Sequence, residues 1–211
     1  MVNFDQLTEA IVAGDSDASL ELTKKAMNAG ISATEILSKG LLPGMEIIGE
    51  QFGNEEVWFP ELLMAANAMK AAVAFLGPEL SKNKVLSVGK YVIGTVEGDA
   101  HDIGKNIVKM MLEQNGWEVT DLGTDVPIEK FCSVIKENSF DILGLSALLT
   151  ITMPVMADVV KALKIAGVRD KVKIMVGGSP LTQSFADQIG ADAYAKNGAE
   201  AVKKAKGLIS R

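Results

Sequence analysis

The residues best suited to chemistry lie together in one loop. His101, the only histidine of the 211-residue chain, stands two residues after Asp99 in a glycine-containing segment, Glu97–Asn106. A carboxylate at this spacing can accept a hydrogen bond from the ring Nδ1–H of the imidazole, which leaves Nε2 free to bind a metal. A single histidine taken at random is more often structural or merely exposed. The carboxylate beside this one favours a metal ligand instead.

A glycine-rich loop between a strand and a helix is also typical of phosphate binding, so the spacing of the glycines matters. The phosphate loop requires the pattern G-x-x-x-x-G-K-[S/T]. Here five residues separate Gly98 from Gly104, and Asn106 follows the lysine. The dinucleotide-binding pattern G-x-G-x-x-G is absent as well. The spacing therefore excludes both nucleotide motifs.

The loop also cannot form a closed metal site unaided. Its acids beside the imidazole, Asp99 and Asp102, leave His101 short of the full tetrahedral set that a structural zinc ion prefers. The donor set suits one protein ligand to a metal whose other ligands come from a macrocycle.

An α/β domain is expected to position this loop. From Lys90 onward, short apolar strands alternate with amphipathic helices, which predicts a parallel, doubly wound (Rossmann-like) sheet of five strands with right-handed crossovers. In such sheets a ligand lies beyond the carboxyl ends of the strands, where the strand order reverses. The predicted strands are Tyr91–Val96, Trp117–Leu122, Ile142–Leu145, Val172–Val176 and Ala191–Tyr194. The predicted helices lie near residues 104–115, 127–138, 153–166, 180–189 and 198–209.

The first 80 residues predict a separate four-helix bundle. Asp15 and Ser32 stand where helix N-caps are expected, and Gly30 stands where a helix should end. Pro43 predicts a kink or a break in the third helix, and Pro60 is expected to open the fourth. Short connections between helices are typical of such bundles.

The boundary between the two parts is expected just after this bundle. The Gly77-Pro78 pair should end the fourth helix near Leu76, and Ser81–Lys84 is the expected linker. The sequence therefore predicts a helical domain over residues 1–82 and an α/β domain over residues 83–211.

The amino-acid composition limits the classes of protein to which the chain can belong. The chain is 48% hydrophobic and 23% charged, as in ordinary globular proteins. Its lone Cys132 excludes an intrachain disulfide and fits a reducing compartment, and the polar start MVNFDQLTEA does not resemble a secretory signal. The longest uncharged stretch, residues 142–157, holds several polar residues and is interpreted as buried core rather than a membrane span. We expect a soluble, cytoplasmic protein.

The distribution of charge argues against a nucleic-acid partner. The net charge is −6, and residues 1–84 hold the whole excess, with 12 acids against 6 bases. Nucleic-acid binders cluster their basic residues where the phosphates lie. No such cluster is present in the sequence.

Three motifs give the chain a family resemblance. Asp99-x-His101-x-x-Gly104, Ser146-x-Leu148 and Gly177-Gly178 stand in the order and spacing of the cobalamin-binding signature. The helical half, through residues 40–53 and 59–70, resembles the cap domain of cobalamin-dependent methionine synthase. Together the two halves resemble the small corrinoid proteins of methyltransferase systems that use methanol, methylamines or methoxylated aromatics.

The resemblance implies a role for particular residues. His101 would replace the corrinoid's own base as lower axial ligand of cobalt (base-off, His-on), with Asp99 on its other nitrogen. In methionine synthase a serine extends this pair, and Thr152 stands at that position here. Taken without the resemblance, Gly177-Gly178 would be interpreted as a tight turn before Ser179, and Trp58 could belong to the bundle core. The implied cofactor contacts are Gly98, Asp99, His101, Asp102, Ile103, Gly104, Ser146, Leu148, Thr150, Gly177 and Gly178, with Trp58, Leu62 and Leu63 from the cap.

The implied function is that of a methyl shuttle. A substrate-specific methyltransferase would methylate the corrinoid, a second methyltransferase would pass the methyl group to tetrahydrofolate or coenzyme M, and a reductive activator would restore the cofactor. The corrinoid subunit of an adenosylcobalamin-dependent isomerase would carry the same motif but has less use for the cap. A cobalamin-based regulator would need a basic DNA-binding module, which the sequence lacks.

Overall fold

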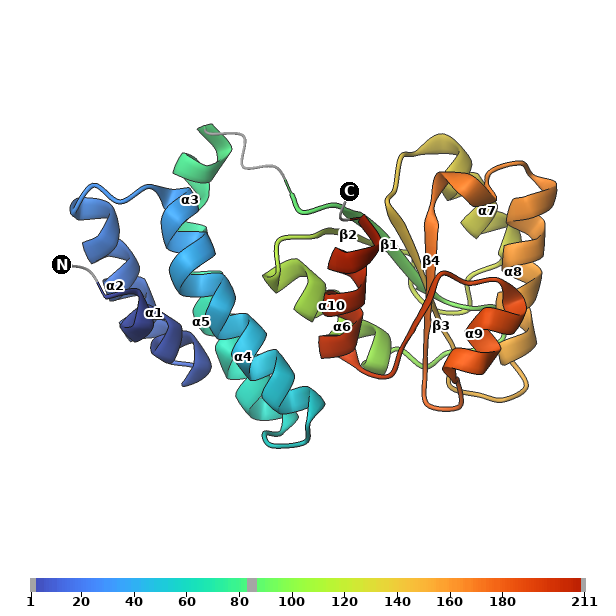
Figure 1. Ribbon diagram of the computed structural model, residues 1–211, viewed down its shortest axis with the longest axis horizontal. Helices are drawn as coiled ribbons and strands as arrows, with labels where there is room; N and C mark the ends of the chain where they lie inside the picture. The colour runs from blue at the N-terminus through green and yellow to red at the C-terminus, as the bar shows by residue number, and fades with distance from the viewer. Residues whose placement is uncertain (1–2, 83–86, 210–211) are drawn as a thin grey trace. The chain divides into compact units, whose positions relative to one another are not determined.

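The computed structural model describes residues 3–82 and 87–209 and divides the chain into two compact units, Met1–Leu86 and Ser87–Arg211. Figure 1 shows the first as helices only and the second as a sheet flanked by helices. Each unit is described by itself. Part of the expected linker, residues 83 and 84, lies outside the described residues.

Within the described residues, the first unit consists of four helices, as predicted. One helix is composite, because a π-helical turn joins two α-helical pieces without a break. The elements are α1 (Phe4–Val12), α2 (Ser16–Asn28), α3 (Ala33–Ile36), the turn η1 (Leu37–Leu41), α4 (Leu42–Gly53) and α5 (Phe59–Lys82).

The predicted caps are present in this unit. The Asp15 carboxylate accepts a hydrogen bond from the Ala18 amide at 2.9 Å, and the Ser32 hydroxyl accepts one from the Glu35 amide at 3.2 Å. Gly30 has the left-handed backbone, φ +82°, that ends α2. Local sequence therefore determines where these helices begin and end.

The two internal prolines act differently. Pro43 lies in the first turn of α4, directly after the π-helical turn, and the helix continues through it without the break that was one of the two expected outcomes. Widening the helix there accommodates a residue that has no N–H to donate. The expectation that Gly77-Pro78 ends the fourth helix is wrong, because α5 continues to Lys82. Proline lacks an N–H donor and crowds the carbonyl four residues earlier, but Glu79 and the residues after it continue the helix.

α5 is the central helix of this unit. Leu62, Ala65, Ala68, Ala72 and Leu76 lie at helical spacing and are completely buried, and the buried Ser19 hydroxyl of α2 donates to the Ala68 carbonyl at 3.0 Å. By length and composition alone, Phe59–Leu80 would also be apolar enough to cross a membrane, with a mean hydropathy of 1.3. Core helices of soluble proteins meet the same criterion. The packed face of α5 accounts for part of its apolar residues, whereas Leu63, Met64 and Phe75 are exposed.

The second unit is the predicted doubly wound domain. Its five strands are all parallel, in the order β2-β1-β3-β4-β5. Helices α6 and α10 cover one face, and α7, α8 and α9 cover the other (Figure 1). The strands are β1 (Lys90–Thr95), β2 (Glu118–Asp121), β3 (Ile142–Ser146), β4 (Lys173–Gly177) and β5 (Ala193–Ala195). The helices are α6 (Ile103–Gln114), α7 (Ile128–Glu137), α8 (Met153–Ile165), the 3₁₀ turn η2 (Arg169–Lys171), α9 (Gln183–Ile189) and α10 (Gly198–Ile209).

Strand order decides where the loops of this unit meet. The chain leaves β1 for β2 on one side and then crosses to β3 on the other side of β1, so the order reverses between β1 and β3. Thr95 and Ser146, the last residues of these two strands, are partners in the ladder. The loops that follow them therefore begin side by side at the carboxyl edge of the sheet.

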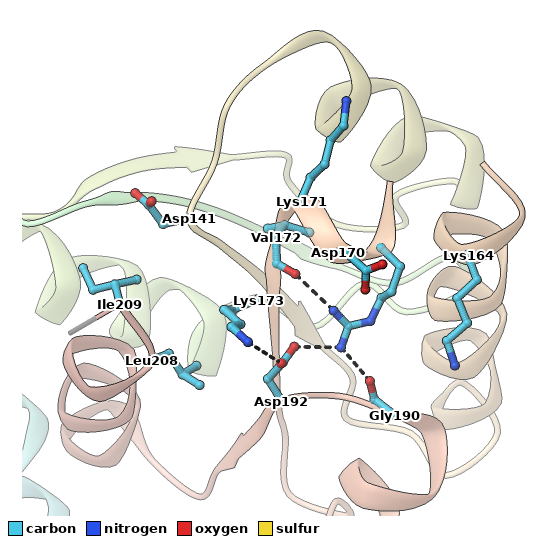
Figure 2. Close-up of a pocket in the computed structure, with 11 residues that line it drawn as sticks. Asp141, Lys164, Asp170, Lys171, Val172, Lys173, Gly190, Asp192, Leu208 and Ile209 are labelled. Atoms are coloured by element: carbon cyan, nitrogen blue, oxygen red, sulfur yellow. Dashed lines mark hydrogen bonds and ion pairs between the residues drawn. The ribbon is translucent and has the colours of Figure 1, made fainter. Parts of the chain in front are cut away.

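A cluster of charged residues lies at the opposite edge of the sheet, where the strands begin. It lies beside a cavity of about 590 Å³ shown in Figure 2. The mostly buried Asp192 carboxylate accepts from the Arg169 guanidinium at 2.7 Å, from Lys173 Nζ at 3.2 Å and from the Ile174 amide at 2.8 Å. Burial acts to raise the pKa of Asp192, but the Ile174 amide, Arg169 and Lys173 together hold the pKa below its usual value.

We expect Asp192→Ala to lower the free energy of unfolding by about 2 kcal/mol at pH 7, because a mostly buried guanidinium and an amide lose a charged acceptor. A depressed pKa in the folded state stabilises the protein above the unfolded value of about 3.9, and this contribution is lost as the pH falls below it. Urea unfolding at pH 7 and near pH 3 measures the change. The control is Asp170→Ala, because the exposed Asp170 has no hydrogen bond or ion pair with any residue that the structure describes. Equal effects of the two substitutions would contradict the prediction.

Candidate functional site

The loops after β1 and β3 bring the sequence-predicted residues together. Asp99 and His101 follow β1, and Leu148 and Thr152 follow β3, about fifty positions further along the chain. They meet at the carboxyl edge of the sheet, beside the point where the strand order reverses. Doubly wound folds bind their ligands at this place.

Asp99 is the centre of the site. Its side chain is completely buried and accepts five hydrogen bonds. One oxygen, Oδ1, accepts from the His101 amide at 3.0 Å and from His101 Nδ1 at 2.7 Å. The other, Oδ2, accepts from the amides of Leu148 and Leu149 at 2.8 and 3.2 Å and from the Thr152 hydroxyl at 2.8 Å.

These contacts keep Asp99 charged. Burial acts to raise the pKa of its carboxyl group, but hydrogen bonds from the His101 and Leu148 amides, the imidazole and the Thr152 hydroxyl together hold the pKa far below its usual range. An ionised carboxylate can only accept hydrogen bonds, so its bond to the ring requires a proton on His101 Nδ1. In the neutral imidazole, Nε2 then carries the free lone pair.

The surroundings of His101 fit a bulky, largely apolar ligand. The imidazole is 50% exposed, and apolar side chains stand out into solvent on both loops: Ile103 is 76% exposed and Ile151 80% exposed. Leu148 is also exposed. Among the described residues, no group of three or more His, Cys, Asp or Glu side chains could hold a metal ion. One oriented imidazole within an apolar rim suits a metal that a macrocycle already holds.

Thr152 lies where the serine of the related motif is expected to act. Its side chain is buried, and its hydroxyl lies 2.8 Å from Asp99 Oδ2 and 2.9 Å from the Leu149 carbonyl. A hydroxyl has one hydrogen, so it can donate to only one of these acceptors at a time. The extra methyl group lies beside Gly98, because a Cβ added to Gly98 would meet it at 3.6 Å.

The glycines of the signature differ in what their backbones require. Gly98 has φ +81°, and a Cβ added to Gly104 would meet no atom within 4 Å. Gly178 has φ +144°, and a Cβ there would lie 1.8 Å from the Ala147 carbonyl oxygen. Only glycine therefore lets the turn after β4 approach the loop after β3. A Cβ at Gly177 would lie 3.2 Å from the Ala195 carbonyl oxygen.

The other predicted contacts have varied positions. Ser146 is the half-buried last residue of β3, and Thr150 is exposed in the loop after it. Asp102 is the N-cap residue of α6 and accepts a hydrogen bond from the Asn106 side chain at 3.0 Å. Lys105, between Gly104 and Asn106, is not available to bind a phosphate, because its buried ammonium donates hydrogen bonds to Asp121 and Asn106.

In the helical unit, the three predicted cap contacts are not equivalent. Trp58 is 77% exposed and Leu63 is also exposed, so both present apolar surface. Leu62 is completely buried in the core of the unit and has no surface to offer a ligand. Helical spacing explains the difference, because neighbouring residues of one helix point in different directions.

Sequence reasoning missed part of the site. The uncharged stretch 142–157 was expected to be buried core, but Leu149 and Ile151 are exposed, as is Leu148, which the resemblance had assigned to the site. β3, one face of α8, Ala147 and Thr152 are the buried parts of the stretch. The available signal was an apolar run that continues past the end of a predicted strand without helical or strand periodicity. A second missed residue is Asp125, which contacts the backbone of the Asp99 loop.

The geometry defines a protein that binds a metal–macrocycle cofactor of the corrinoid type. A B12 binding domain model matches residues 89–205, and a second B12 binding domain model matches residues 4–76. The chain belongs to this B12-binding family and is a small corrinoid protein that binds cobalamin or a related corrinoid. The resemblance drawn from the motifs is thereby confirmed.

Similar proteins of known name support this family assignment. Dimethylamine corrinoid protein 1 of Methanosarcina acetivorans is 46% identical over 206 residues, which cover 97% of this chain and 96% of that protein. A solved cobalamin-binding protein from Desulfitobacterium hafniense DCB-2 has a TM-score of 0.86 and 35% identity, covering all of both chains. In the methanol:cobalamin methyltransferase complex of Methanosarcina barkeri, a chain matches with a TM-score of 0.80 and 30% identity, covering 98% of this chain and 79% of that one.

Proposed function

We propose that this corrinoid protein carries a methyl group between two methyltransferases, with His101 as lower axial ligand of the cofactor through Nε2. The observation that carries the proposal is the bond between His101 Nδ1 and buried Asp99, which leaves Nε2 as the free nitrogen within an apolar rim. When bound, the cofactor's cobalt supplies the centre that accepts and releases the methyl group.

The protein's own residues hold the cofactor and protect it from water. The exposed Ile103, Leu148 and Ile151 would contact apolar edges of the cofactor, and the open space beside Gly104 would leave room for its nucleotide tail. In the helical unit, Trp58 and Leu63 present exposed apolar side chains that are available to an apolar ligand. The signature residues assigned to this role are Gly98, Asp102, Gly104, Ser146, Thr150, Gly177 and Gly178.

Asp99 and Thr152 control the proton on the imidazole. Asp99 holds a proton at His101 Nδ1, which strengthens Nε2 as a ligand. The ionised Asp99 carboxylate would hold this proton at Nδ1 whether or not Nε2 is engaged as a ligand. The Thr152 hydroxyl can turn from Asp99 to the Leu149 carbonyl, so it adjusts how strongly Asp99 accepts from the ring.

The partners follow from this role and from the relatives. A substrate-specific methyltransferase transfers the methyl group of a methylamine, of methanol or of a methoxylated aromatic compound to the bound corrinoid. A second methyltransferase passes it to tetrahydrofolate or coenzyme M, and a reductive activator restores the cofactor after accidental oxidation. The dimethylamine corrinoid protein and the methanol:cobalamin methyltransferase complex, both similar to this chain, support the first two classes of donor. We place the protein in the cytoplasm.

Methyl transfer with separate partners tests the proposal. The protein is reconstituted with a corrinoid, reduced, and mixed with each candidate methyltransferase of its source organism together with methylamines, methanol or a methoxylated aromatic. We expect one pairing to change the cobalt absorbance spectrum to that of the methylated cofactor, and one acceptor enzyme to reverse the change. Failure of every donor pairing, with turnover of an adenosylated cofactor by an isomerase partner, would support the isomerase subunit instead.

A further inference from the structure

Asp125 has a backbone conformation that requires explanation. It lies in the loop between β2 and α7 with φ +51°, and the only other described non-glycine residue with positive φ is Glu55 in the helical unit. Side chains other than glycine lose about 1 kcal/mol in this region, although aspartate and asparagine tolerate it best. A glycine would suit this backbone better. The aspartate must therefore contribute through its side chain.

That side chain contacts the loop that carries the metal ligand. Asp125 Oδ1 accepts a hydrogen bond from the Gly98 amide at 2.7 Å, and the Asp125 amide donates to the Asp99 carbonyl at 3.0 Å. The two bonds hold the peptide groups before Gly98 and after Asp99. Gly98 itself has φ +81°, a conformation that only its lack of a side chain makes easy.

The loop of Asp125 is itself anchored to the sheet. The Thr95 amide donates to the Gly123 carbonyl, and the Val126 amide donates to the Thr95 carbonyl, both at 3.0 Å. Val96 and Val126 form a parallel bridge, so strand pairing continues one step beyond β1. Asp121 Oδ1 also accepts from the Gly123 amide at 2.9 Å. These bonds fix the Asp125 loop to the sheet, so that Asp125 can hold the neighbouring loop in place.

We propose that Asp125 is a positioning residue that fixes the backbone of Gly98 and Asp99, so that the Asp99 carboxylate meets His101 Nδ1 and Nε2 faces outward. Two loops then hold Asp99 from different directions. The loop after β3 holds its carboxylate through Leu148, Leu149 and Thr152, and the loop after β2 holds its main chain through Asp125. The consequence for methyl transfer rests on the proposed function, whereas the orientation of His101 in the cofactor-free protein does not.

The single histidine makes the proposal measurable without cofactor. In protein labelled with ¹⁵N histidine, the Nδ1–H resonance belongs to His101 alone, and its exchange with water reports how firmly Asp99 holds it. Asp125→Gly keeps the backbone conformation and removes the acceptor. We expect it to speed this exchange about tenfold, as for the loss of one hydrogen bond to a charged group. Asp125→Asn keeps an acceptor oxygen and tolerates the same φ, so exchange should stay within about twofold of wild type.

Two controls separate positioning from general stability. Glu55→Gly relieves the other positive-φ residue and should leave the His101 resonance unchanged, because Glu55 lies in the helical unit. Far-ultraviolet circular dichroism during thermal unfolding checks that each variant is folded at the temperature of the exchange measurement. Corrinoid affinity gives a second readout, expected to fall in Asp125→Gly and to be retained in Asp125→Asn.

Each outcome decides the question. Wild-type exchange in folded Asp125→Gly would overturn the proposal, because the carboxylate would then not matter to His101. Faster exchange in Asp125→Asn, equal to that of Asp125→Gly, would overturn it too, because an acceptor alone would not suffice. Failure of the wild-type protein to carry methyl groups would instead contradict the proposed function and leave the exchange result intact.

Discussion

Replacement of His101 by alanine is expected to lower the rate of methyl transfer by at least about 100-fold, beyond the 10–100-fold that follows from losing a residue that only orients a metal ligand. If His101 ligates the cobalt as proposed, the absorbance spectrum of the bound corrinoid should change at the same time. The fold should survive, since the imidazole is half exposed and the position 101 amide still donates to Asp99. Reconstitution, spectroscopy and stopped-flow methyl transfer measure these effects.

Exogenous imidazole provides the control for this variant. If the lost ligand is the cause, added imidazole should restore part of the wild-type spectrum in His101→Ala and leave the wild-type protein unchanged. Thermal unfolding should show a modest loss of stability of about 1–2 kcal/mol in His101→Ala, because buried Asp99 loses the hydrogen bond from Nδ1 but keeps its four other donors. A variant with wild-type spectrum and rate would remove His101 from the role of axial ligand.

Substitution of Gly178 by alanine is expected to lower the free energy of unfolding by about 3 kcal/mol, since overpacking and a disfavoured backbone region act together. The added Cβ would lie 1.8 Å from the Ala147 carbonyl oxygen, in a backbone with φ +144°. The next residue after Ala147 is Leu148, whose amide binds Asp99. We therefore expect corrinoid affinity to fall as well, because the displaced loop withdraws its donors from Asp99.

Gly167→Ala is the matched control. Gly167 has φ +68°, and a Cβ added there would meet no atom within 4 Å, so only the backbone preference of about 1 kcal/mol is lost. Urea unfolding and corrinoid titration compare the two variants. If Gly178→Ala matches Gly167→Ala in both measurements, the close approach of the two loops has no energetic importance.

Most of the secondary structure was predictable from the sequence, and the errors of prediction have local causes. Each strand of the sheet was expected within two residues of its observed bounds, because buried parallel strands form short apolar runs between polar turns. Caps such as Asp15 act on amides a few residues away, so their effect can be read locally. The end of α5 was misplaced because the rule for proline ignores the rest of the helix.

From spacing alone, the site was predictable only where its residues are neighbours in the chain, whereas distant members such as Thr152 were assigned by the family resemblance. Asp99 and His101 are two positions apart, so their hydrogen bond follows from spacing alone. Asp125 lies 27 positions from Gly98, and neither a periodicity nor a motif pointed to it. Leu149 and Ile151 were expected to be buried but are exposed, because an apolar run in a sequence looks the same whether it lies in a core or on an exposed surface.

The amino-acid sequence by itself determined the elements of this protein, their caps and the paired imidazole and carboxylate, because these depend on residues within a few positions of one another. Apart from Thr152, which the family resemblance assigned, only the tertiary structure decided which distant groups support that pair, and it also brought Thr152 into contact. The strand order β2-β1-β3 places the loops after all three strands at one edge, and this brings Thr152, 53 positions away, to Asp99 Oδ2 and Asp125 to the Gly98 amide. The physical reason is that hydrogen bonds act over about 3 Å in space, irrespective of distance along the chain.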